Sequence, residues 1–288
     1  MAEVATFATS DQLLVVIDPV ARRMDGESVR IAKDVLSAGA ATKVCLPDGP
    51  DEFARALARR GSRRPVVVGD DRALVRTVSL LHRQRELAEC ALSVVPVGAV
   101  LSLAGSLGVP TGAVAAARAV LDGVERRLDL LVDDSDGIVL GALRIPPVLA
   151  VGVPAAVTDG GGRVPWLRSA RSLVRTLGSA RPARVPAVAV PAAGPARLRV
   201  EVDGVTLVDL DQPVREVSVT PGAGGGAAAV EVRPASVGTE AVPLRAAGRR
   251  VTVSGSDFRY RADAVVSGPV RRRTWTVWEG ALGLTLPG

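Results

Sequence analysis

The sequence is poor in aromatic residues, cysteine and histidine. Aromatic residues make up only 2% of the 288 residues, so the core must be built from valine, leucine and alanine. The two cysteines, Cys45 and Cys90, have neither a CxxC partner nor a histidine beside them, and we expect buried free thiols in a reducing compartment. His82 is the only histidine, which excludes a multi-histidine metal site, and we expect it on the surface of an arginine-rich helix.

Long hydrophobic runs and lysines are also scarce. No apolar segment approaches the roughly 20 residues that cross a bilayer, and residues 1–12 show no signal-peptide pattern. We therefore expect a cytoplasmic protein that is at most peripheral to the membrane. The net charge of +6 comes almost entirely from arginine in a chain rich in alanine, glycine, proline and valine. Charge of that origin is weak evidence for an acidic partner, and we expect no specific nucleic acid.

Strands and helices alternate in the first part of the chain. Continuous apolar runs predict buried strands at 13–17, 42–46, 65–68 and 92–95. Helical spacing of apolar residues predicts helices at 28–38, 51–59, 74–91, 100–107 and 111–121, the second of them capped by Asp51. This alternation is typical of an α/β domain with a mainly parallel sheet, which we place at residues 1–130.

The alternation of strands and helices ends after residue 127. A hairpin is predicted from 128–132 and 138–143, around a D-D-S-D-G turn that lacks the acidic spacing of a calcium loop. One more helix is expected at 166–177, and the glycine runs at 160–162 and 222–226 are expected to be flexible loops. Short strands are predicted at 198–202, 205–210, 214–220, 228–232, 250–254, 274–278 and 282–286. We therefore predict an antiparallel β-sandwich domain over residues 131–288.

Two turns at predicted strand ends are candidate ligand sites. The third strand runs into Gly69-Asp70-Asp71-Arg72, and the fourth ends close to Gly98. In open α/β sheets, ligands bind outside the carboxyl ends of the strands, and glycine lets a backbone approach a phosphate. Asp70 would repel a polyanion unless a cation or Arg72 offsets its charge. A plain turn with a helix cap remains the alternative for the first site, and a strand-ending turn for the second.

The predicted second domain is locally basic. Its arginines include Arg245, Arg249, Arg250, Arg259, Arg261 and Arg271–Arg273. Such a cluster is either a solvated face or a contact for anionic lipid headgroups, and the sequence leaves both open.

Taken together, these segments resemble bacterial diacylglycerol kinases and the related sphingosine-kinase-like lipid kinases. That family has a first strand ending in N-P, then V-V-x-G-G-D-G-T-x-N-E, then P-x-G-T-x-N-D-x-A-x-x-L-G-x-P, then A-x-x-x-x-x-G-x-x-R-x-x-D, and a late D-G-E. The similar stretches here are Val15–Pro19, Val66–Arg76, Pro96–Pro110, Ala117–Asp129 and Phe258–Val265, with Trp275–Pro287 matching the last strands. The resemblance implies an α/β nucleotide domain followed by a β-sandwich, a site in the cleft between them, and transfer of the ATP γ-phosphoryl group to a lipid hydroxyl with Mg²⁺. It also implies that Gly69, Asp71, Arg72 and Gly98 are the nucleotide-binding positions.

The departures from the family pattern lie at the motif positions that hold the phosphates and supply the general base. G-G-D-G-T is replaced by Gly69–Ala73, and the following Glu is Arg76. The Thr, Asn and Asp of the next motif are Ala99, Leu101 and Ser102. The closing D-G-E is Asp263-Ala264-Val265, so Asp263 is the one remaining catalytic candidate and the expected general base is absent.

Phosphoryl transfer depends on positioning and charge neutralisation, and this chain lacks most of the groups that provide them. We therefore predict a non-catalytic relative that binds a nucleotide, a lipid or a protein partner, with homo-oligomers also open. An active lipid kinase with divergent residues, using ATP and Mg²⁺, is the first alternative. A purely structural or regulatory protein is the second.

Overall fold

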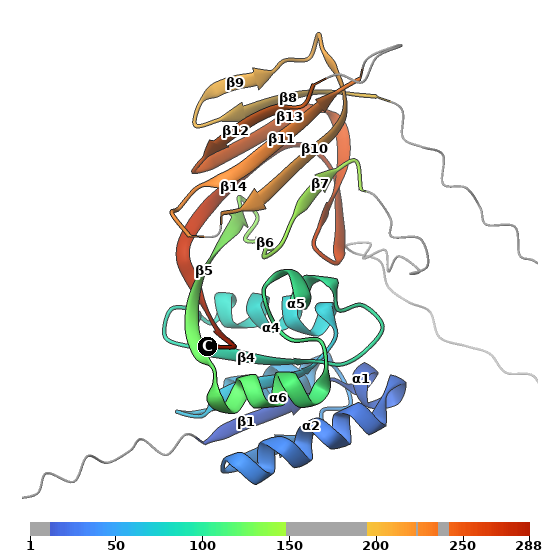
Figure 1. Cartoon of the computed structure of the whole chain (residues 1–288). Helices are drawn as coiled ribbons and strands as arrows, with labels where there is room; N and C mark the ends of the chain where they lie inside the picture. Colours follow the sequence, from blue (N-terminus) through green and yellow to red (C-terminus); the bar gives the residue numbers. More distant parts are fainter. Residues whose placement is uncertain (1–11, 148–194, 223, 236–241) are drawn as a thin grey trace, which may run out of the picture. The chain divides into compact units, whose positions relative to one another are not determined.

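The computed structural model describes residues 12–147, 195–222, 224–235 and 242–288 (Figure 1). The helix predicted at 166–177 and the glycine run at 160–162 lie outside these residues. The expectation of an α/β chain is confirmed, although several helices and strands differ from the predicted ones.

Strands and helices alternate in the first part, as predicted. The elements are β1 (Leu13–Ile17), α1 (Pro19–Met24), α2 (Gly26–Gly39), β2 (Thr42–Cys45), α3 (Pro50–Ala58), β3 (Arg64–Gly69), α4 (Asp71–Arg83), β4 (Ala91–Pro96), α5 (Ser102–Ser106) and α6 (Ala113–Asp122). Helix α4 ends eight residues before the predicted end, and α1 was not predicted. Asp51 lies in the first turn of α3 and does not cap it, because the N-cap residue is Gly49.

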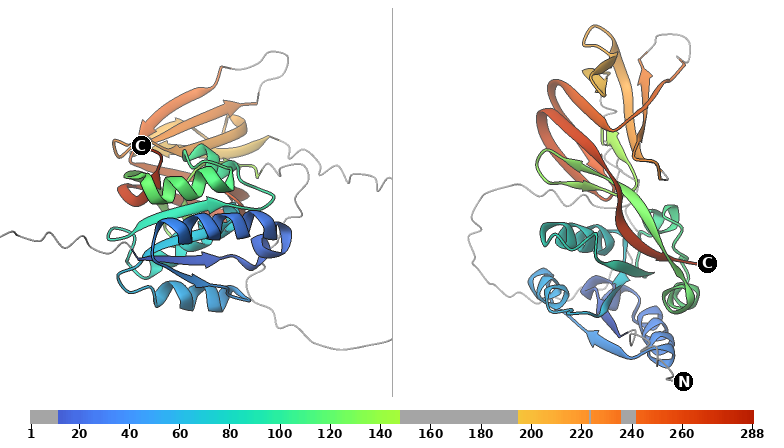
Figure 2. Two further views of the ribbon diagram at one scale, coloured as in Figure 1. Left: turned by 60° about the horizontal axis from the view of Figure 1, so that its bottom comes forward. Right: turned by 90° about the vertical axis from the view of Figure 1, so that its left-hand side faces the viewer.

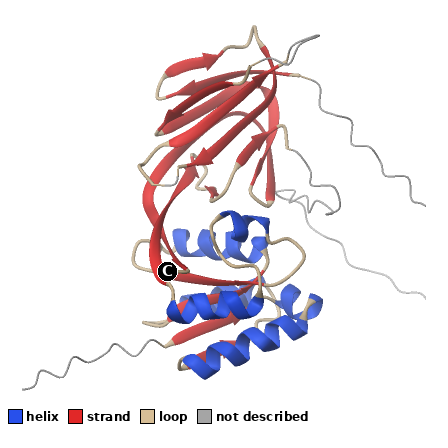
Figure 3. Ribbon diagram, in the orientation of Figure 1, coloured by secondary structure: helices blue, strands red, loops and turns tan. Residues whose placement is uncertain are grey.

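A parallel sheet forms the centre of this part. β1 pairs in parallel with both β2 and β3, and β3 pairs in parallel with β4. Because successive strand residues point to opposite faces, each strand serves two cores. Leu14 and Val16 pack with residues of α3 and α4, whereas Leu13, Val15 and Ile17 pack with residues of α2 and α6. Helices accordingly cover both faces (Figure 3).

Closely spaced strands follow α6. They are β5 (Val124–Asp133), β6 (Ile138–Val139), β7 (Leu143–Ile145), β8 (Ala196–Val202), β9 (Val205–Val208), β10 (Pro213–Pro221), β11 (Ala228–Pro234), β12 (Leu244–Gly248), β13 (Arg250–Ala262) and β14 (Val265–Leu286). The predicted hairpin is present, with β5 antiparallel to β6. β12 was not predicted. β13 and β14 are much longer than their predicted segments, and the two predicted segments at 274–278 and 282–286 are one strand.

β14 is the strand that connects the sheets. Over its 22 residues it pairs antiparallel with β13 and with β5, and its last residues run parallel to β4 (Figure 2). A buried hydrogen bond of 2.9 Å from Ser93 Oγ to Thr285 Oγ1 joins β4 and β14. The end of the chain thus completes the first sheet. β5 runs without a break through residue 130, so the domain division there stays a prediction.

The core of the later strands is built around Trp275, which is fully buried. Its ring meets Tyr260 edge-on, with centroids 5.3 Å apart and planes at 86°. Valines from β8, β10, β11 and β13 surround this pair. With so few aromatic residues, most members of this core are valines, with leucine and alanine among the others, as the composition predicted.

Candidate functional site

The two predicted turns lie next to each other at the carboxyl edge of the parallel sheet. Gly69 pairs with Pro96 across β3 and β4, and Val97 N–H donates to the Gly69 carbonyl at 3.0 Å. A Cβ placed on Gly98 would lie 3.0 Å from the Cβ of Asp70. The structure therefore brings Gly69, Asp70 and Gly98 together where α/β folds bind ligands.

Both glycines are constrained by the chain's own packing. A Cβ on Gly69 would lie 2.6 Å from the Cβ of Ala73 and 3.1 Å from that of Asp18. Gly98 has a φ of +136°, a conformation that only glycine adopts readily. Close approach of neighbouring side chains at Gly69 and the positive φ at Gly98 are thus sufficient to explain both glycines without a phosphate.

Asp70 caps α4. Its Oδ1 accepts hydrogen bonds from the N–H groups of Arg72 and Ala73, each at 3.1 Å. The N-terminus of a helix that follows a strand is where a phosphate would bind, because its first N–H groups have no partner within the helix. Here a carboxylate of the chain already holds that position, as the alternative of a turn with a helix cap predicted.

Asp71 points to a different helix. Its carboxylate is 2% exposed and accepts from Leu103 N at 2.9 Å and Ala104 N at 3.1 Å. Ser102 Oγ donates to it as well, at 3.2 Å. Since the N-cap residue of α5 offers no side-chain cap, Asp71 supplies that function from 30 residues earlier in the chain. Its oxygens are engaged by backbone donors.

An ion pair between a buried carboxylate and a partly exposed arginine closes the same edge of the sheet. Arg76 Nη1 lies 2.8 Å from Oδ2 of Asp18, whose side chain is 3% exposed. Asp18 also caps α1 through Val20 N, and the Arg76 guanidinium lies 5.7 Å from the Phe53 ring centroid. The sequence reading missed this pair. The signal was present, because the end of β1 and the first turns of α4 meet at one edge of a parallel sheet.

Asp263 is a buried carboxylate in a turn. It accepts from the N–H groups of Leu140, Gly141 and Ala142 at 2.7–2.9 Å, and its own backbone has a φ of +50°. Burial raises its pKa above the usual value, the three N–H donors oppose that shift, and the negative charge of Asp71 adds to it. Asp263 thus ties the β13–β14 turn to the segment between β6 and β7, while Val265 is 42% exposed.

Arg72 is the one predicted site residue whose side chain is unengaged. It lies in the first turn of α4, is exposed, and forms no ion pair within the described part of the chain. A cation there is the group that could meet an incoming anion. It belongs to a helix end whose first N–H donors Asp70 already engages.

Two further expectations need correction. His82 is 7% exposed, not on the surface, because its ring packs against Trp278 with centroids 5.1 Å apart. Cys45 is only half-buried, whereas Cys90 is buried as predicted, and burial raises the pKa of the Cys90 thiol. Both cysteines are free.

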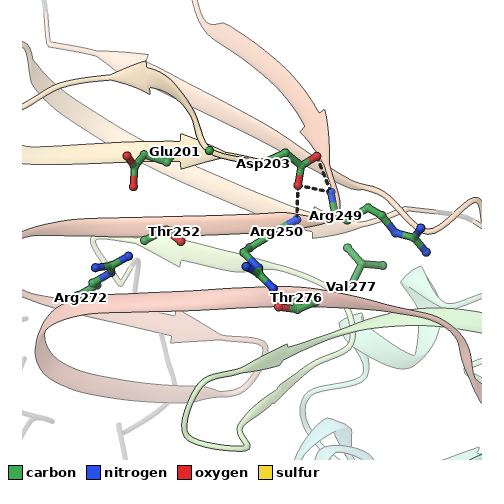
Figure 4. A pocket seen from close by; sticks show the side chains of 9 residues that line it. Glu201, Asp203, Arg249, Arg250, Thr252, Arg272, Thr276 and Val277 are labelled. Carbon is green, nitrogen blue, oxygen red and sulfur yellow. Dashed lines mark hydrogen bonds between the residues drawn. The ribbon is translucent and has the colours of Figure 1, made fainter.

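The predicted basic region contains a hollow in the surface of β8, β13 and β14. Its volume is about 640 Å³, and Arg249, Arg250 and Arg272 line it together with two threonines and two acids (Figure 4). Asp203 is engaged by the N–H groups of Arg249 and Arg250, as the dashed lines show. Arg249 also pairs with Glu279 at 3.1 Å. We call this hollow the arginine pocket.

Within the described ranges, no group of three or more histidine, cysteine and acidic side chains is placed to hold a metal ion. Among the helices described, none is long and apolar enough to cross a membrane.

Comparison with known proteins identifies the fold. No protein-family model and no curated protein matches this chain. A provisionally assigned diacylglycerol kinase from Bacillus anthracis str. Sterne matches with a TM-score of 0.67 and 13% identity, over 96% of this chain and 97% of that one. A second crystal structure, of a diacylglycerol kinase from the same organism, matches over the same shares with a TM-score of 0.65 and 11% identity.

The chain has the fold of diacylglycerol kinases. The resemblance seen in the motifs is thus confirmed at the level of the fold. An NAD kinase from Archaeoglobus fulgidus, solved in complex with ATP, is also similar, with a TM-score of 0.51 and 14% identity over 95% of this chain and 93% of that one. At these identities the likeness concerns the fold and leaves the reaction to be argued from the residues present.

We expect Asp71→Ala to lower the free energy of unfolding by about 3 kcal/mol, because it leaves the buried N–H groups of Leu103 and Ala104 without an acceptor. Asp70→Ala is the matched control, since it removes a half-buried helix cap and should cost about 1 kcal/mol. Urea unfolding of both variants measures the difference. Equal small effects would show that the Asp71 carboxylate is not a structural cap.

Proposed function

We propose that this chain is a non-catalytic protein with the diacylglycerol kinase fold, which works by binding and not by phosphoryl transfer. The observation that carries the proposal is the Asp70 carboxylate on the N–H groups of Arg72 and Ala73. A nucleotide phosphate at that position would meet a fixed negative charge in place of free donors.

The residues at this edge do not fit Mg²⁺ with ATP. Binding of Mg²⁺ at a kinase site requires carboxylate oxygens that can face the ion and the phosphates. Asp71 and Asp263 instead accept five backbone N–H groups between them. Val265 stands where the resemblance calls for a general base. An active lipid kinase would require both carboxylates to leave these partners.

Binding of an anionic ligand is better supported at the arginine pocket than at the strand-end site. The guanidinium groups of Arg250 and Arg272 form no ion pair with any residue in the described part of the chain, and both side chains are exposed. Val205, which follows the Asp203-Gly204 turn at the rim, is 71% exposed. Cations beside an exposed apolar side chain suit the headgroup region of an anionic membrane, so we take anionic lipid as the ligand.

We expect no phosphorylated product when the purified protein is incubated with labelled ATP, Mg²⁺ and either diacylglycerol or a sphingoid base. The physical reason is that the backbone N–H groups at the start of α4 are already bonded to Asp70 and that no general base is present. A sample without protein is the control. Turnover above that blank, if abolished by Asp71→Asn, would restore the enzyme interpretation.

We expect the protein to co-sediment with vesicles containing phosphatidylserine and not with pure phosphatidylcholine. Arg250→Gln and Arg272→Gln should each weaken binding by about 1 kcal/mol, the contribution of one basic side chain near an anionic surface. Arg271→Gln is the matched control, because that neighbouring residue points to the opposite face of the strand and pairs with Asp257 at 2.9 Å. If all three variants bind equally, the arginine pocket is only a solvated surface.

A further inference from the structure

A second pocket lies where the C-terminal end of α4 meets β14. Its volume is about 540 Å³, within the roughly 300–1,000 Å³ of small-molecule sites. Its lining includes His82, Arg83, Arg85, Leu87, Asp136 and Trp278. We call it the Trp278 pocket, and it shares no residue with the strand-end site or the arginine pocket.

The pocket has an aromatic wall that is held in place. Trp278 is 46% exposed although it is one of only three tryptophans in the chain. Its ring lies 5.1 Å from that of His82 at 63°, an edge contact. His82 is fixed in turn by Asp136, whose Oδ1 lies 2.6 Å from His82 Nε2. Trp278 therefore presents an oriented indole surface that a planar ring could stack upon.

The pocket also has an excess of positive charge. Arg83 and Arg85 are exposed, and no carboxylate in the described residues pairs with either guanidinium. The one acid in the lining, Asp136, is directed at His82. Two guanidinium groups beside an aromatic surface suit a ligand that combines a flat ring with an anionic group.

Arg85 occupies a backbone position that normally belongs to glycine. Its φ is +59°, its N–H donates to the His82 carbonyl, and Glu86 N–H donates to the Leu81 carbonyl, both at 2.9 Å. These two bonds define the turn that commonly ends a helix with glycine in the left-handed conformation. An arginine there is strained, and its side chain lines the pocket.

A purely structural explanation covers part of these observations. Basic residues at the end of a helix interact favourably with its dipole, which accounts for the charge of Arg83. That effect does not require arginine at a left-handed position, and it does not explain a half-exposed tryptophan beside it.

We propose that the Trp278 pocket binds a small planar aromatic anion, with the ring stacked on Trp278 and the anionic group paired with Arg83 and Arg85. The shared chemistry could come from a mononucleotide or from an aromatic carboxylate. The proposal is independent of the lipid contact and of the strand-end site.

Calorimetric titration with 5′-AMP and with naphthalene-2-carboxylate tests the proposal and distinguishes the two sources. We expect at least one of them to bind. If 5′-AMP binds, adenosine and ribose 5-phosphate should each bind at least about tenfold more weakly, because each lacks one of the two groups. Absence of binding by both aromatic anions would overturn the proposal.

Arg85→Gly gives the sharpest variant, because it should change stability and binding in opposite directions. Glycine relieves the left-handed backbone, so the thermal midpoint should rise by about 2 °C, while affinity for the aromatic anion should fall about tenfold. Trp278→Leu should also weaken binding while keeping an apolar contact with His82. Arg72→Gln is the control: it should leave binding unchanged, and loss of binding there would place the ligand at the strand-end site. Unchanged affinity in Arg85→Gly and Trp278→Leu would contradict the proposal.

Discussion

Backbone N–H groups that are buried in loops must find an acceptor, and in this chain aspartate carboxylates supply it. Asp71 holds the start of α5, Asp263 holds the segment between β6 and β7, and Asp129 accepts from Gly226 and Gly280 at 3.0 and 2.8 Å. Each joins segments that lie far apart in the sequence. A carboxylate can accept two or three such hydrogen bonds at once, so one side chain can satisfy several N–H groups. Its oxygens then have few lone pairs left for a metal ion or a substrate.

The same constraint governs the strand-end corner, where the chain's own carboxylates hold the helix ends and loops. Asp70 caps the helix end, and the buried carboxylate of Asp18 forms an ion pair with the partly exposed Arg76. Arg76 stabilises this corner because the Asp18 carboxylate, which is only 3% exposed, would otherwise be a buried charge without a partner. The carboxylates at this site thus stabilise the loops. An anion from solution would have to compete with them for the same N–H groups.

Local sequence patterns were sufficient for the central strands, and they offered a turn with a helix cap at Gly69–Arg72 as the alternative to a ligand site. A continuous apolar run such as Leu13–Ile17 predicts a buried strand in an α/β chain. An acidic residue between a strand and a helix is a common helix cap. The patterns failed where the usual local signal is absent and where a distant partner decides. The end of α4 was missed because Arg85 stands where glycine usually signals the turn. The burial of His82 depends on Trp278 and Asp136, and the length of β14 depends on pairing with three other strands.

The central claim is that the strand-end site is closed by the chain's own carboxylates, and calorimetric titration of ATP tests it most directly. The titration compares the Trp278→Leu protein with the Trp278→Leu/Asp70→Gly double variant, each with and without Mg²⁺, so that the second pocket does not contribute. We predict no measurable binding with Asp70 present, and a gain of affinity in Asp70→Gly because both the charge and the Cβ at the helix end are removed. Mg²⁺-dependent binding of ATP with Asp70 in place, reduced by Arg72→Ala, would contradict the account.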